Sequence, residues 1–322
     1  MSQNLYPLQF EPILKERIWG GEKLKTILNK PIVSKITGES WELSTVQGDV
    51  SVVANGVLKG KSLMDLIDET PDAILGTKVY ERFGKQFPLL FKYLDAREDL
   101  SIQVHPNDKL AKERHNSFGK TEMWYVMQAD ADARIIVGFK EDSSKEEYLK
   151  HLHDNTLVSI LDDVKAKSGD VFFLETGTVH AIGAGLVVAE IQQTSDITYR
   201  LYDFDRVDAQ GNKRELHVDL ALDAINYNKV DTQKKYETKV NTSNTVVDCP
   251  YFTTNFLPLE NKLEVAKNGE TFTVYMCIEG DFEIEYDGFK QAYKKGDTVL
   301  VPAAINAFNL SGKASILEIY IS

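Results

Sequence analysis

Short apolar runs separated by glycine, asparagine and aspartate recur along most of the chain. Examples are DVSVVANGVL, ARIIVGF, DVFFLETG, GLVVAEIQQ, DITYRLYDF, FTVYMCIEG, FEIEY and DTVLVP. Runs of this length and spacing are typical of strands joined by turns. We therefore predict a mainly β protein of the sandwich or barrel type.

The stretch LSIQVHPND, residues 100–108, shows the alternation of a strand with one buried face. Because side chains alternate between the two faces of a strand, this stretch has an apolar row and a polar row. The apolar row is Leu100, Ile102 and Val104, and the polar row is Ser101, Gln103 and His105. Pro106 ends the pattern. The polar row indicates a set of side chains with a chemical function.

Helical periodicity interrupts the strand pattern in three places. Ser62 precedes LMDLIDE, and Ser144 precedes KEEYLKHLHD with Glu147 three residues later, which is a capping-box arrangement. A third periodicity covers ELHVDLALDAINY, residues 215–227. We expect helices at these places, as inserts that cover a β framework.

A polar stretch, NYNKVDTQKKYETKVNTSNT, follows the third helical pattern and lacks the spacing of a core element. We place a domain boundary there, with an N-terminal domain over residues 1–235 and a C-terminal domain over residues 236–322.

A weak internal repeat relates the two parts of the chain. AKSGDVFFLETGTVHAIG, residues 166–183, aligns with YKKGDTVLVPAAINAFNL, residues 293–310, and EMWYVMQADADARIIV resembles TFTVYMCIEGDFEIEY. Two copies of one β unit are expected. With a one-residue gap, His180 falls opposite Asn306, so we expect that a metal site in the first copy is lost in the second.

Composition narrows the range of partners. The net charge is −12 and the isoelectric point is near 5.1, which argues against a nucleic acid or an anionic membrane as the partner. The first thirty residues lack the apolar core of a signal peptide, so a cytoplasmic location is the expectation. Cys249 and Cys277 are too few for a disulfide framework and are expected to be buried thiols.

Four polar residues stand out as possible metal ligands: Gln103, His105, Glu122 and His180. Imidazole, carboxylate and amide oxygen suit zinc or another divalent first-row ion, and a site without thiolates is typical of catalytic metals with an open position. Ordinary surface positions would explain the same residues, and spacing alone leaves both interpretations open. The remaining histidines are expected to be solvated or hydrogen-bonded: His115, His151, His153 and His217. The cluster DFDRVD, residues 203–208, is expected to be a solvated loop.

Several of these stretches together resemble the type I mannose-6-phosphate isomerases in their short bacterial form, a family of the cupin superfamily. They are LSIQVHPND, GKTEMWYV, GTVHAIGAG and IQQTSDITYRLYDFDR, with IWGG, GESWELS and FPLLFKYLDA upstream. The resemblance runs in the family's order from about residue 7 to residue 220, and the C-terminal part resembles a generic cupin repeat. The second ligand histidine of the general cupin pattern is missing after His105, as it is in this family.

The resemblance implies a bicupin fold, meaning two jelly-roll β-barrels with helical inserts, and one zinc ion per chain. It also implies that Lys120 lies in the substrate pocket and that Arg200 is catalytic. Glu190 and Asp196 lie at spacings before Arg200 that the family shares. For Asp196 an ordinary turn residue is an equal alternative.

The activity that the resemblance implies is the interconversion of mannose 6-phosphate and fructose 6-phosphate through a cis-enediol. Such a reaction needs a base and a cation beside the developing oxyanion. The base is left open between Glu190, Asp196 and a water molecule, and Arg200 is expected to stabilise charge because guanidinium is a poor base. Ser101 and Lys120, and more weakly Lys92, are candidates for binding the phosphate.

Two alternatives stay open from the sequence. One is an iron-dependent cupin oxygenase, because a set of two histidines and one carboxylate also suits Fe(II). The other is a noncatalytic bicupin that binds a sugar phosphate. In each case the partner is a small molecule, and the chain is expected to be a monomer or a homodimer.

Overall fold

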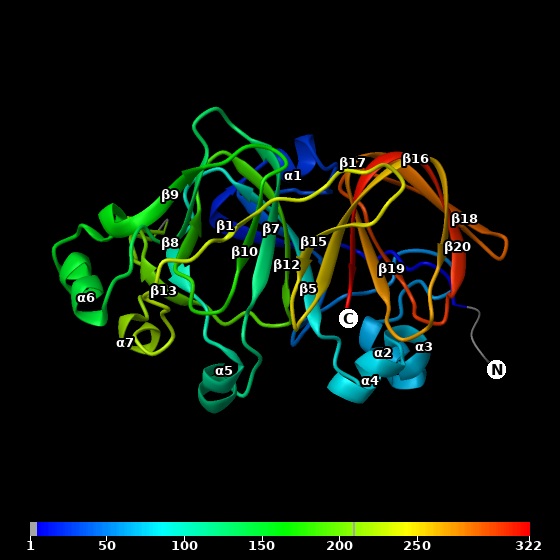
Figure 1. Ribbon diagram of the computed structural model, residues 1–322, viewed down its shortest axis with the longest axis horizontal. Coiled ribbons are helices and arrows are strands. Elements are labelled where there is room, and N and C mark those ends of the chain that lie inside the picture. The colour runs from blue at the N-terminus through cyan, green and yellow to red at the C-terminus, as the bar shows by residue number, and fades with distance from the viewer. Residues whose placement is uncertain (1–4, 209) are drawn as a thin grey trace.

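The structure is a computed structural model that describes residues 5–208 and 210–322. These residues form two β units side by side, with most of the helices at the left end and along the lower edge (Figure 1). The predicted mainly β class is confirmed.

The first unit is built from two facing antiparallel sheets. The larger sheet has the order β1 (Ile13–Gly21), β2 (Thr37–Leu43), β5 (Leu89–Ala96), β12 (Leu186–Gln193), β7 (Glu122–Ala129), β10 (Val171–Leu174) and β14 (Gln233–Lys234). The smaller sheet has the order β13 (Tyr199–Tyr202), β6 (Ile102–Val104), β11 (His180–Ile182), β8 (Arg134–Phe139) and β9 (Leu161–Lys165). A separate hairpin joins β3 (Thr45–Val46) to β4 (Asp49–Val50).

The second unit is one strongly bent sheet. Its order is β15 (Asn244–Asp248), β16 (Thr253–Ala266), β20 (Ala307–Tyr320), β17 (Thr273–Tyr286) and β18 (Phe289–Lys294), with β19 (Thr298–Val301) paired to the first half of β17. A register shift between Cys277 and Glu279 bends β17, so that β19 and β18 pair with its two halves.

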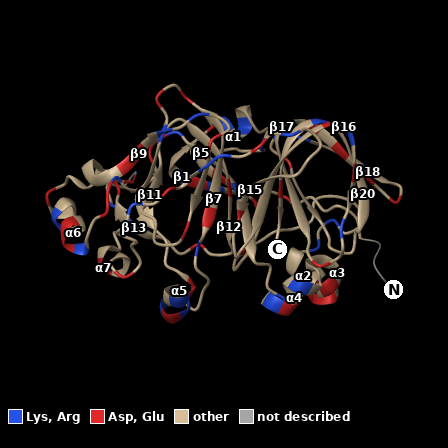
Figure 2. Cartoon of the chain, viewed as in Figure 1, with Lys and Arg blue, Asp and Glu red and all other residues tan. Residues whose placement is uncertain are grey.

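Helices cover the outside of the sheets. They are α1 (Lys23–Thr26), α2 (Leu63–Glu69), α3 (Pro71–Leu75), α4 (Thr77–Phe83), α5 (Asp108–His115), α6 (Lys145–His153), the 3-10 helix η1 (Leu157–Ile160) and α7 (Val218–Ala221). Charges of both signs are interspersed on α4, α5 and α6 (Figure 2). Among residues 5–208 and 210–322, no helix has the length and apolar character needed to cross a membrane.

A large apolar core lies between the two units. The outer face of the larger sheet contributes Tyr93, Tyr125 and Ile191, and the second unit contributes residues such as Phe256 and Met276. Tyr125 and Phe256 stack with their ring centroids 6.3 Å apart. Because successive strand residues point to opposite faces, the neighbours of these residues, such as Glu190, point into the first unit instead.

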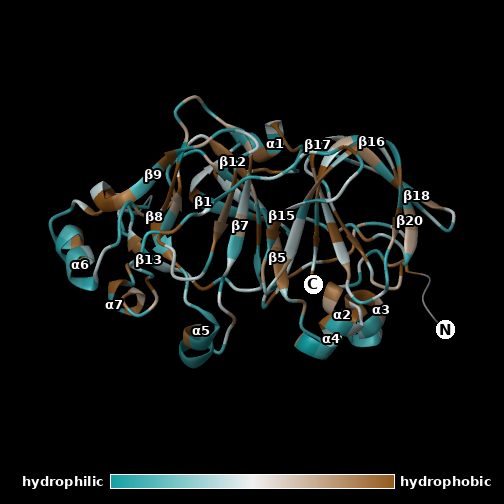
Figure 3. Cartoon of the chain, viewed as in Figure 1, coloured by the Kyte–Doolittle hydropathy of each residue, from teal (hydrophilic) through white to brown (hydrophobic). Residues whose placement is uncertain are grey.

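The predicted alternation of residues 100–108 holds for most of the stretch. Ile102 and Val104 pack into an apolar cluster that α6 and α7 cover on the outside of the smaller sheet, and Ser101 and His105 are buried on its other side. Leu100 differs, because it precedes β6 and packs with Trp19 in the core between the two sheets. Figure 3 shows hydrophobic strands in the interior and hydrophilic surfaces on α5 and α6.

The two expected closed barrels are not formed. In the first unit the strands at the edges of the facing sheets do not pair with one another. Charged side chains from β1 and β2, such as Arg17 and Glu39, and from β13, such as Arg200, occupy the space between the sheets and line a cavity there.

The helical predictions were partly correct. Ser62 forms a full capping box, because its hydroxyl accepts from the Asp65 N–H and the Asp65 carboxylate accepts from the Ser62 N–H. Ser144 forms only the first half: its Oγ accepts from the Glu147 N–H at 3.1 Å, whereas the Glu147 carboxylate accepts from the Ser143 hydroxyl.

Two helical segments differ from the expected ones. The helix expected over residues 215–227 is reduced to α7, and bends and turns follow it. Helix α5 was not predicted; the side chain of Asn107 caps it by accepting from the Leu110 N–H at 3.0 Å. The short, mostly polar sequence of α5 lacks a strong apolar periodicity, which explains why the pattern did not reveal it.

Strands β14 and β15 lie on either side of residue 235, in the first and second units respectively. The N-terminal segment nevertheless reaches the second unit, because the Leu8 N–H donates to the Leu300 carbonyl at 2.7 Å. Helix α3 does so as well, through the Ala303 N–H and the Ile74 carbonyl, 3.2 Å apart. The two-domain division at residue 235 stays a prediction, and these contacts tie both sides of it together.

Candidate metal centre and substrate cavity

Two histidines and a glutamate converge between the sheets of the first unit. His105 follows β6, Glu122 begins β7 and His180 begins β11. One potential ligand atom from each lies within 4.8 Å of those of the other two, and all three side chains are buried. His180 Nε2 is 3.4 Å from Glu122 Oε1, and His105 Nε2 is 3.6 Å from Glu122 Oε2.

Local structure brings these residues to the ends of their strands. Pro106 stops the strand after His105, whose carbonyl accepts from the Gly177 N–H at 3.0 Å. Gly177 has a φ of +91°, and a Cβ there would lie 2.8 Å from the Ala224 carbonyl oxygen. Only glycine fits this turn without strain, and the turn leads directly to His180.

Hydrogen bonds to the backbone orient both imidazoles. His105 Nδ1 lies 2.8 Å from the Ile197 carbonyl, and His180 Nδ1 lies 2.8 Å from the Thr178 carbonyl. A carbonyl can only accept, so each Nδ1 carries the proton and each Nε2 presents a lone pair to the centre. This is the tautomer that metal-ligating histidines use.

Burial and charge keep both imidazoles neutral. Burial, together with the nearby ammonium of Lys120, holds the pKa of His105 well below its usual range and lowers the pKa of His180 to about 3. For Glu122 burial raises the pKa to about 7, against the opposing charge of Lys120. Glu122 Oε1 is fully buried and has no hydrogen-bond partner among the described residues.

Gln103 and Lys120 flank this group. Gln103 Nε2 lies 3.3 Å from His180 Nε2, and a half-turn of the amide would present its oxygen at the same place. The Lys120 ammonium contacts the Glu122 carboxylate and lies 3.1 Å from His105 Nε2. Burial alone would lower the pKa of Lys120. The negative charges of Glu122 and Glu190 have the larger combined effect, so the pKa is raised.

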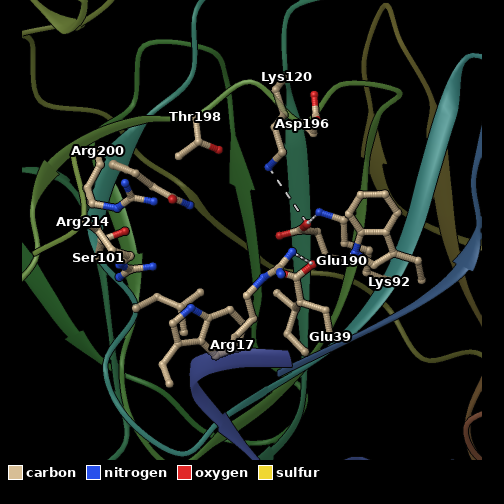
Figure 4. Close-up of a pocket in the computed structure, with 15 residues that line it drawn as sticks. Arg17, Glu39, Lys92, Ser101, Lys120, Glu190, Asp196, Thr198, Arg200 and Arg214 are labelled. Atoms are coloured by element: carbon tan, nitrogen blue, oxygen red, sulfur yellow. Dashed lines mark hydrogen bonds and ion pairs between the residues drawn. The ribbon is translucent and has the colours of Figure 1, made fainter. Parts of the chain in front are cut away.

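A cavity of about 490 Å³ opens beside this group. Figure 4 shows charged side chains from both sheets pointing into it. Its charged and polar lining is Arg17, Glu39, Lys92, Ser101, Gln103, Lys120, Glu190, Asp196, Thr198, Arg200 and Arg214. Cations outnumber carboxylates in this set, which suits a ligand with negative charge.

Glu190 forms the centre of a cross-strand row on the inner face of the larger sheet. It pairs in register with Lys92 on β5 and Trp124 on β7. Lys92 Nζ lies 3.1 Å from Glu190 Oε1, and Trp124 Nε1 donates to Oε2 at 2.9 Å. Burial alone would raise the Glu190 pKa, but Lys120, Lys92 and the Trp124 bond lower it to about 2.

Arg200 lies opposite Gln103 in the register of β13 and β6. Its Nη1 donates to the Glu215 carbonyl at 2.8 Å, and its Nε is buried without a partner among the described residues. Burial and the neighbouring Arg214 lower its pKa. Asp196 is exposed at the cavity edge and lines a second, adjoining hollow as well.

Sequence analysis missed Arg17, Glu39 and Arg214 as cavity residues. Arg17 Nε donates to Glu39 Oε1 at 2.7 Å, and Trp41 Nε1 also donates to Glu39. These hydrogen bonds and the cations of Lys92 and Arg17 lower the pKa of Glu39 against the effect of burial. The blocks IWGG and GESWELS pointed to this region, but alternation alone did not reveal that the charged residue of each strand faces inward.

The loop expected over residues 203–208 is not fully solvated. Asp203 is 6% exposed and accepts from Arg206 Nη2 at 2.6 Å and Arg214 Nε at 2.7 Å. Two guanidiniums neutralise this carboxylate, so it can be buried although Asp205 and Val207 in the same loop are exposed. Arg214 lies in a loop outside the strands, and its bond to Asp203 brings its side chain to the cavity.

The other histidines and the cysteines behave as ordinary residues. His115 Nε2 lies 2.8 Å from the Tyr199 hydroxyl, and His217 Nδ1 accepts from the Arg200 N–H at 3.1 Å. His153 is exposed at the end of α6. Cys277 is buried, whereas Cys249 is only partly buried.

The fold and the site define a cupin-type protein with a buried His/Glu/His group beside a cation-rich cavity. Residues 7–136 match the family described as "Phosphomannose isomerase type I, catalytic domain". Residues 242–321 match the family described as "Mannose-6-phosphate isomerase, cupin domain".

Similar proteins extend over nearly the whole chain. "Mannose-6-phosphate isomerase ManA" of Bacillus subtilis is 38% identical over 317 residues, which is 97% of this chain and 98% of that protein. The mannose-6-phosphate isomerase of Streptococcus mutans is 36% identical over 313 residues, 97% of each. A crystal structure of the Bacillus subtilis mannose 6-phosphate isomerase has a TM-score of 0.89 at 35% identity, covering 98% of this chain and 99% of that one. The chain belongs to the type I phosphomannose isomerase family and is an enzyme of that family.

Proposed function

We propose that this enzyme is a zinc-dependent aldose–ketose isomerase that interconverts mannose 6-phosphate and fructose 6-phosphate through a cis-enediol. The observation that carries the proposal is the His105, Glu122 and His180 group, whose flanking residues Gln103 and Lys120 line a cation-rich cavity. The names of the full-length relatives support the substrate.

The donor set fits a zinc ion. Two imidazoles present Nε2 lone pairs, both are neutral, and Glu122 Oε1 is buried without a hydrogen-bond partner in the described part of the chain. Zinc favours such nitrogen and oxygen ligands, and Gln103 would complete the set through its amide oxygen. One zinc per chain follows. When bound, zinc would polarise the sugar oxygens on C1 and C2.

The chain's own cations have separate tasks in this mechanism. Arg200 lines the cavity and is held by the bond from its Nη1 to the Glu215 carbonyl, and its guanidinium stabilises the enediolate charge. Ser101 and Lys120 bind the phosphate. Both lysines are ion-paired in the structure, Lys120 to Glu122 and Lys92 to Glu190, and Lys92 remains the weaker phosphate candidate of the sequence analysis.

Two carboxylates from the sequence analysis compete for the role of base. Glu190, with a pKa of about 2 and hydrogen bonds to both oxygens, is a weak proton acceptor near neutral pH and holds Lys92 and Trp124 in position. Asp196 lies at the cavity edge with no ion pair among the described residues. We assign proton transfer between C1 and C2 to Asp196. Asp196→Asn should abolish exchange of the C2 proton with solvent while substrate still binds.

A coupled assay of fructose 6-phosphate formation, with metal analysis of the same sample, tests the function. Isomerase activity that falls on zinc removal and returns on zinc addition supports the proposal. Oxygen consumption with bound iron would support the oxygenase instead. Sugar-phosphate binding without turnover of mannose 6-phosphate would contradict the proposed reaction.

The remaining expectations are unchanged by the structure. A cytoplasmic location, a monomeric or homodimeric state, and the absence of nucleic-acid and membrane partners stay predictions from the sequence.

A further inference from the structure

The turn between β15 and β16 joins the second unit to the first close to the His/Glu/His group. Phe252 in this turn is fully buried in the shared core, and its ring stands edge-on to Phe173 of β10 with the centroids 6.5 Å apart. The preceding residue, Tyr251, is half-buried, and its hydroxyl donates to Asp108 Oδ2 at 2.7 Å. A side chain of the second unit therefore bonds the first residue of α5, at the lower edge of the first unit (Figure 1).

Asp108 connects two segments that carry residues of the metal centre. It follows His105 by three residues, and its Oδ1 accepts from the Gly119 N–H at 2.8 Å. Gly119 directly precedes Lys120. The two segments approach so closely that a Cβ on Gly119 would lie 2.7 Å from the backbone nitrogen of Asp108. The carboxylate thus fixes the segment before Lys120 against the segment after His105.

Gln193, at the end of β12, extends this network to the start of β7. Its Nε2 donates to Asp108 Oδ1 at 3.0 Å, and its Oε1 accepts from the Thr121 N–H at 2.9 Å. The Gln193 N–H also donates to the Thr121 carbonyl at 3.1 Å. Thr121 lies between Lys120 and Glu122. The backbone on both sides of Lys120 is therefore held by hydrogen bonds to side chains rather than by a strand partner alone.

The Tyr251 hydroxyl fixes the orientation of the Asp108 carboxylate. Within residues 5–208 and 210–322, it is the one donor to Asp108 Oδ2, while Oδ1 accepts from Gly119 and Gln193. Burial and the hydrogen bond to Asp108 raise the pKa of Tyr251 to about 12, so the hydroxyl keeps its proton near neutral pH. Without this bond the partly exposed carboxylate could rotate about χ2, and both bonds to Oδ1 would lose their alignment.

The residues at the end of this network are sensitive to small displacements. Lys120 and Glu122 are buried and in contact, and Glu122 also lies 3.4 Å from His180 Nε2. Partners outside the ligand shell that orient metal ligands typically change metal affinity by about 10-fold to 100-fold when they are removed. A shift of the backbone at Thr121 would move the Glu122 carboxylate relative to both histidines.

We propose that Tyr251 of the second unit is a positioning residue for the metal centre of the first. It acts through Asp108 and Gln193, which hold the backbone on both sides of Lys120 and so place the Glu122 carboxylate between the two imidazoles. The second unit thus contributes one hydroxyl group to the geometry of a site that it does not line. The inference rests on the proposed function for the identity of the metal, whereas the hydrogen-bonded network itself is independent of it.

Tyr251→Phe removes the hydroxyl alone and tests the proposal with two measurements on the intact chain. In the metal-free protein, amide hydrogen exchange of Gly119 and Thr121 should become on the order of tenfold faster, because their acceptors are no longer fixed. Zinc affinity, measured by competition with a chelator, should fall about tenfold. Tyr236→Phe is the matched control, because that hydroxyl also reaches the first unit, donating to the Gly169 carbonyl at 2.8 Å. It should leave both quantities unchanged.

A double-mutant cycle separates this path from a general loss of stability. Asp108→Ala should weaken zinc binding at least as much as Tyr251→Phe does. In the Asp108→Ala background, Tyr251→Phe should change zinc affinity by less than about twofold, because the carboxylate through which the hydroxyl acts is already absent. The same comparison applies to the exchange rates of Gly119 and Thr121 in the metal-free protein.

Three outcomes would overturn the proposal. Unchanged exchange of Gly119 and Thr121 in Tyr251→Phe would mean that the hydroxyl does not hold this segment. Faster exchange with unchanged zinc affinity would mean that the segment does not position Glu122. Additive losses in the double mutant would mean that Tyr251 does not act through Asp108. If the parent protein binds no zinc, the proposed function fails, and the exchange rates of the metal-free protein then decide the positioning role by themselves.

Discussion

The imidazole rings of His105 and His180 lie with their centroids 4.8 Å apart and tilted by 45°, although 75 residues separate them in the chain. Each ring is held by a bond from Nδ1 to a carbonyl, so both Nε2 atoms converge on the Glu122 carboxylate. The ends of β6 and β11 in the smaller sheet thus face the start of β7 in the larger sheet.

Replacing either histidine should remove metal and activity together. His105→Ala or His180→Ala takes away one ligand of the proposed set. The affinity of the site for zinc should therefore fall by orders of magnitude. Mass-spectrometric metal analysis beside the isomerase assay measures both. His153→Ala, at the exposed end of α6, is the control and should keep full zinc. Full occupancy in both site variants would exclude these histidines as ligands.

Asn306→Ala should leave metal content unchanged. Asn306 aligns with His180 in the internal repeat, but its side chain is exposed, beyond the end of β19. We expect the same zinc stoichiometry as in the parent protein. Loss of a stoichiometric metal in this variant would show that the second unit keeps a metal site.

Arg200→Ala should lower kcat by roughly a hundredfold or more, because in the proposed mechanism its charge stabilises the enediolate in a partly buried cavity. Arg200→Lys keeps the charge but loses the planar fork, and it should recover only part of the rate. Zinc content and the melting temperature should change little.

Arg206 provides the matched comparison for Arg200. It binds Asp203 at 2.6 Å and does not line the cavity. Arg206→Ala should therefore lower the melting temperature with a smaller loss of kcat. If turnover of Arg200→Ala stays within about threefold of the parent while its stability falls, Arg200 is structural and the reaction uses another cation.

Glu190 should contribute stability that disappears in acid. Its pKa is about 2 in the folded protein against an ordinary value of 4.5, so the folded state favours the ionised form. This stabilisation is fully present above pH 4.5 and is lost as the pH falls toward 2. The excess unfolding free energy of the parent over Glu190→Gln should shrink by about 2 kcal/mol between pH 7 and pH 3. Urea unfolding at both pH values measures it, and a difference that is constant with pH would contradict the assigned ion pairs.

Periodicity predicted the strands and pointed to the residues of the His/Glu/His group for a physical reason, and their role as metal ligands stays a proposal. His105, Glu122 and His180 lie at the ends of apolar strands, where alternation and a breaking residue such as Pro106 or Gly177 mark both the face and the edge. The metal-ligand chemistry of these residue types is independent of long-range pairing, so it was visible in the sequence. The roles of Lys120, Arg200, Glu190 and Asp196 came from the family resemblance and stay proposals.

The features that sequence did not reveal depend on contacts between distant segments. Arg214 enters the cavity only because Asp203, eleven residues earlier, is buried and binds it. Glu318 is likewise buried because Lys267, 51 residues earlier, donates to its carboxylate at 2.8 Å. Neither pairing has a local pattern, and in both cases charge neutralisation overrides the usual exposure of polar residues.

Because Tyr125 stacks on Phe256, the sheet that forms one wall of the cavity is supported from behind by the second unit. Trp124, the next residue on β7, bonds Glu190 on the cavity side, while Tyr125 rests on a surface supplied by the second unit. Exchanging residues 236–322 for those of another family member would change the support beneath the larger sheet without changing any residue that lines the cavity. Chimeras joined at residue 235 should fold and keep activity only when the two surfaces of the shared core are complementary. We therefore expect the residues on these two surfaces to change together among family members.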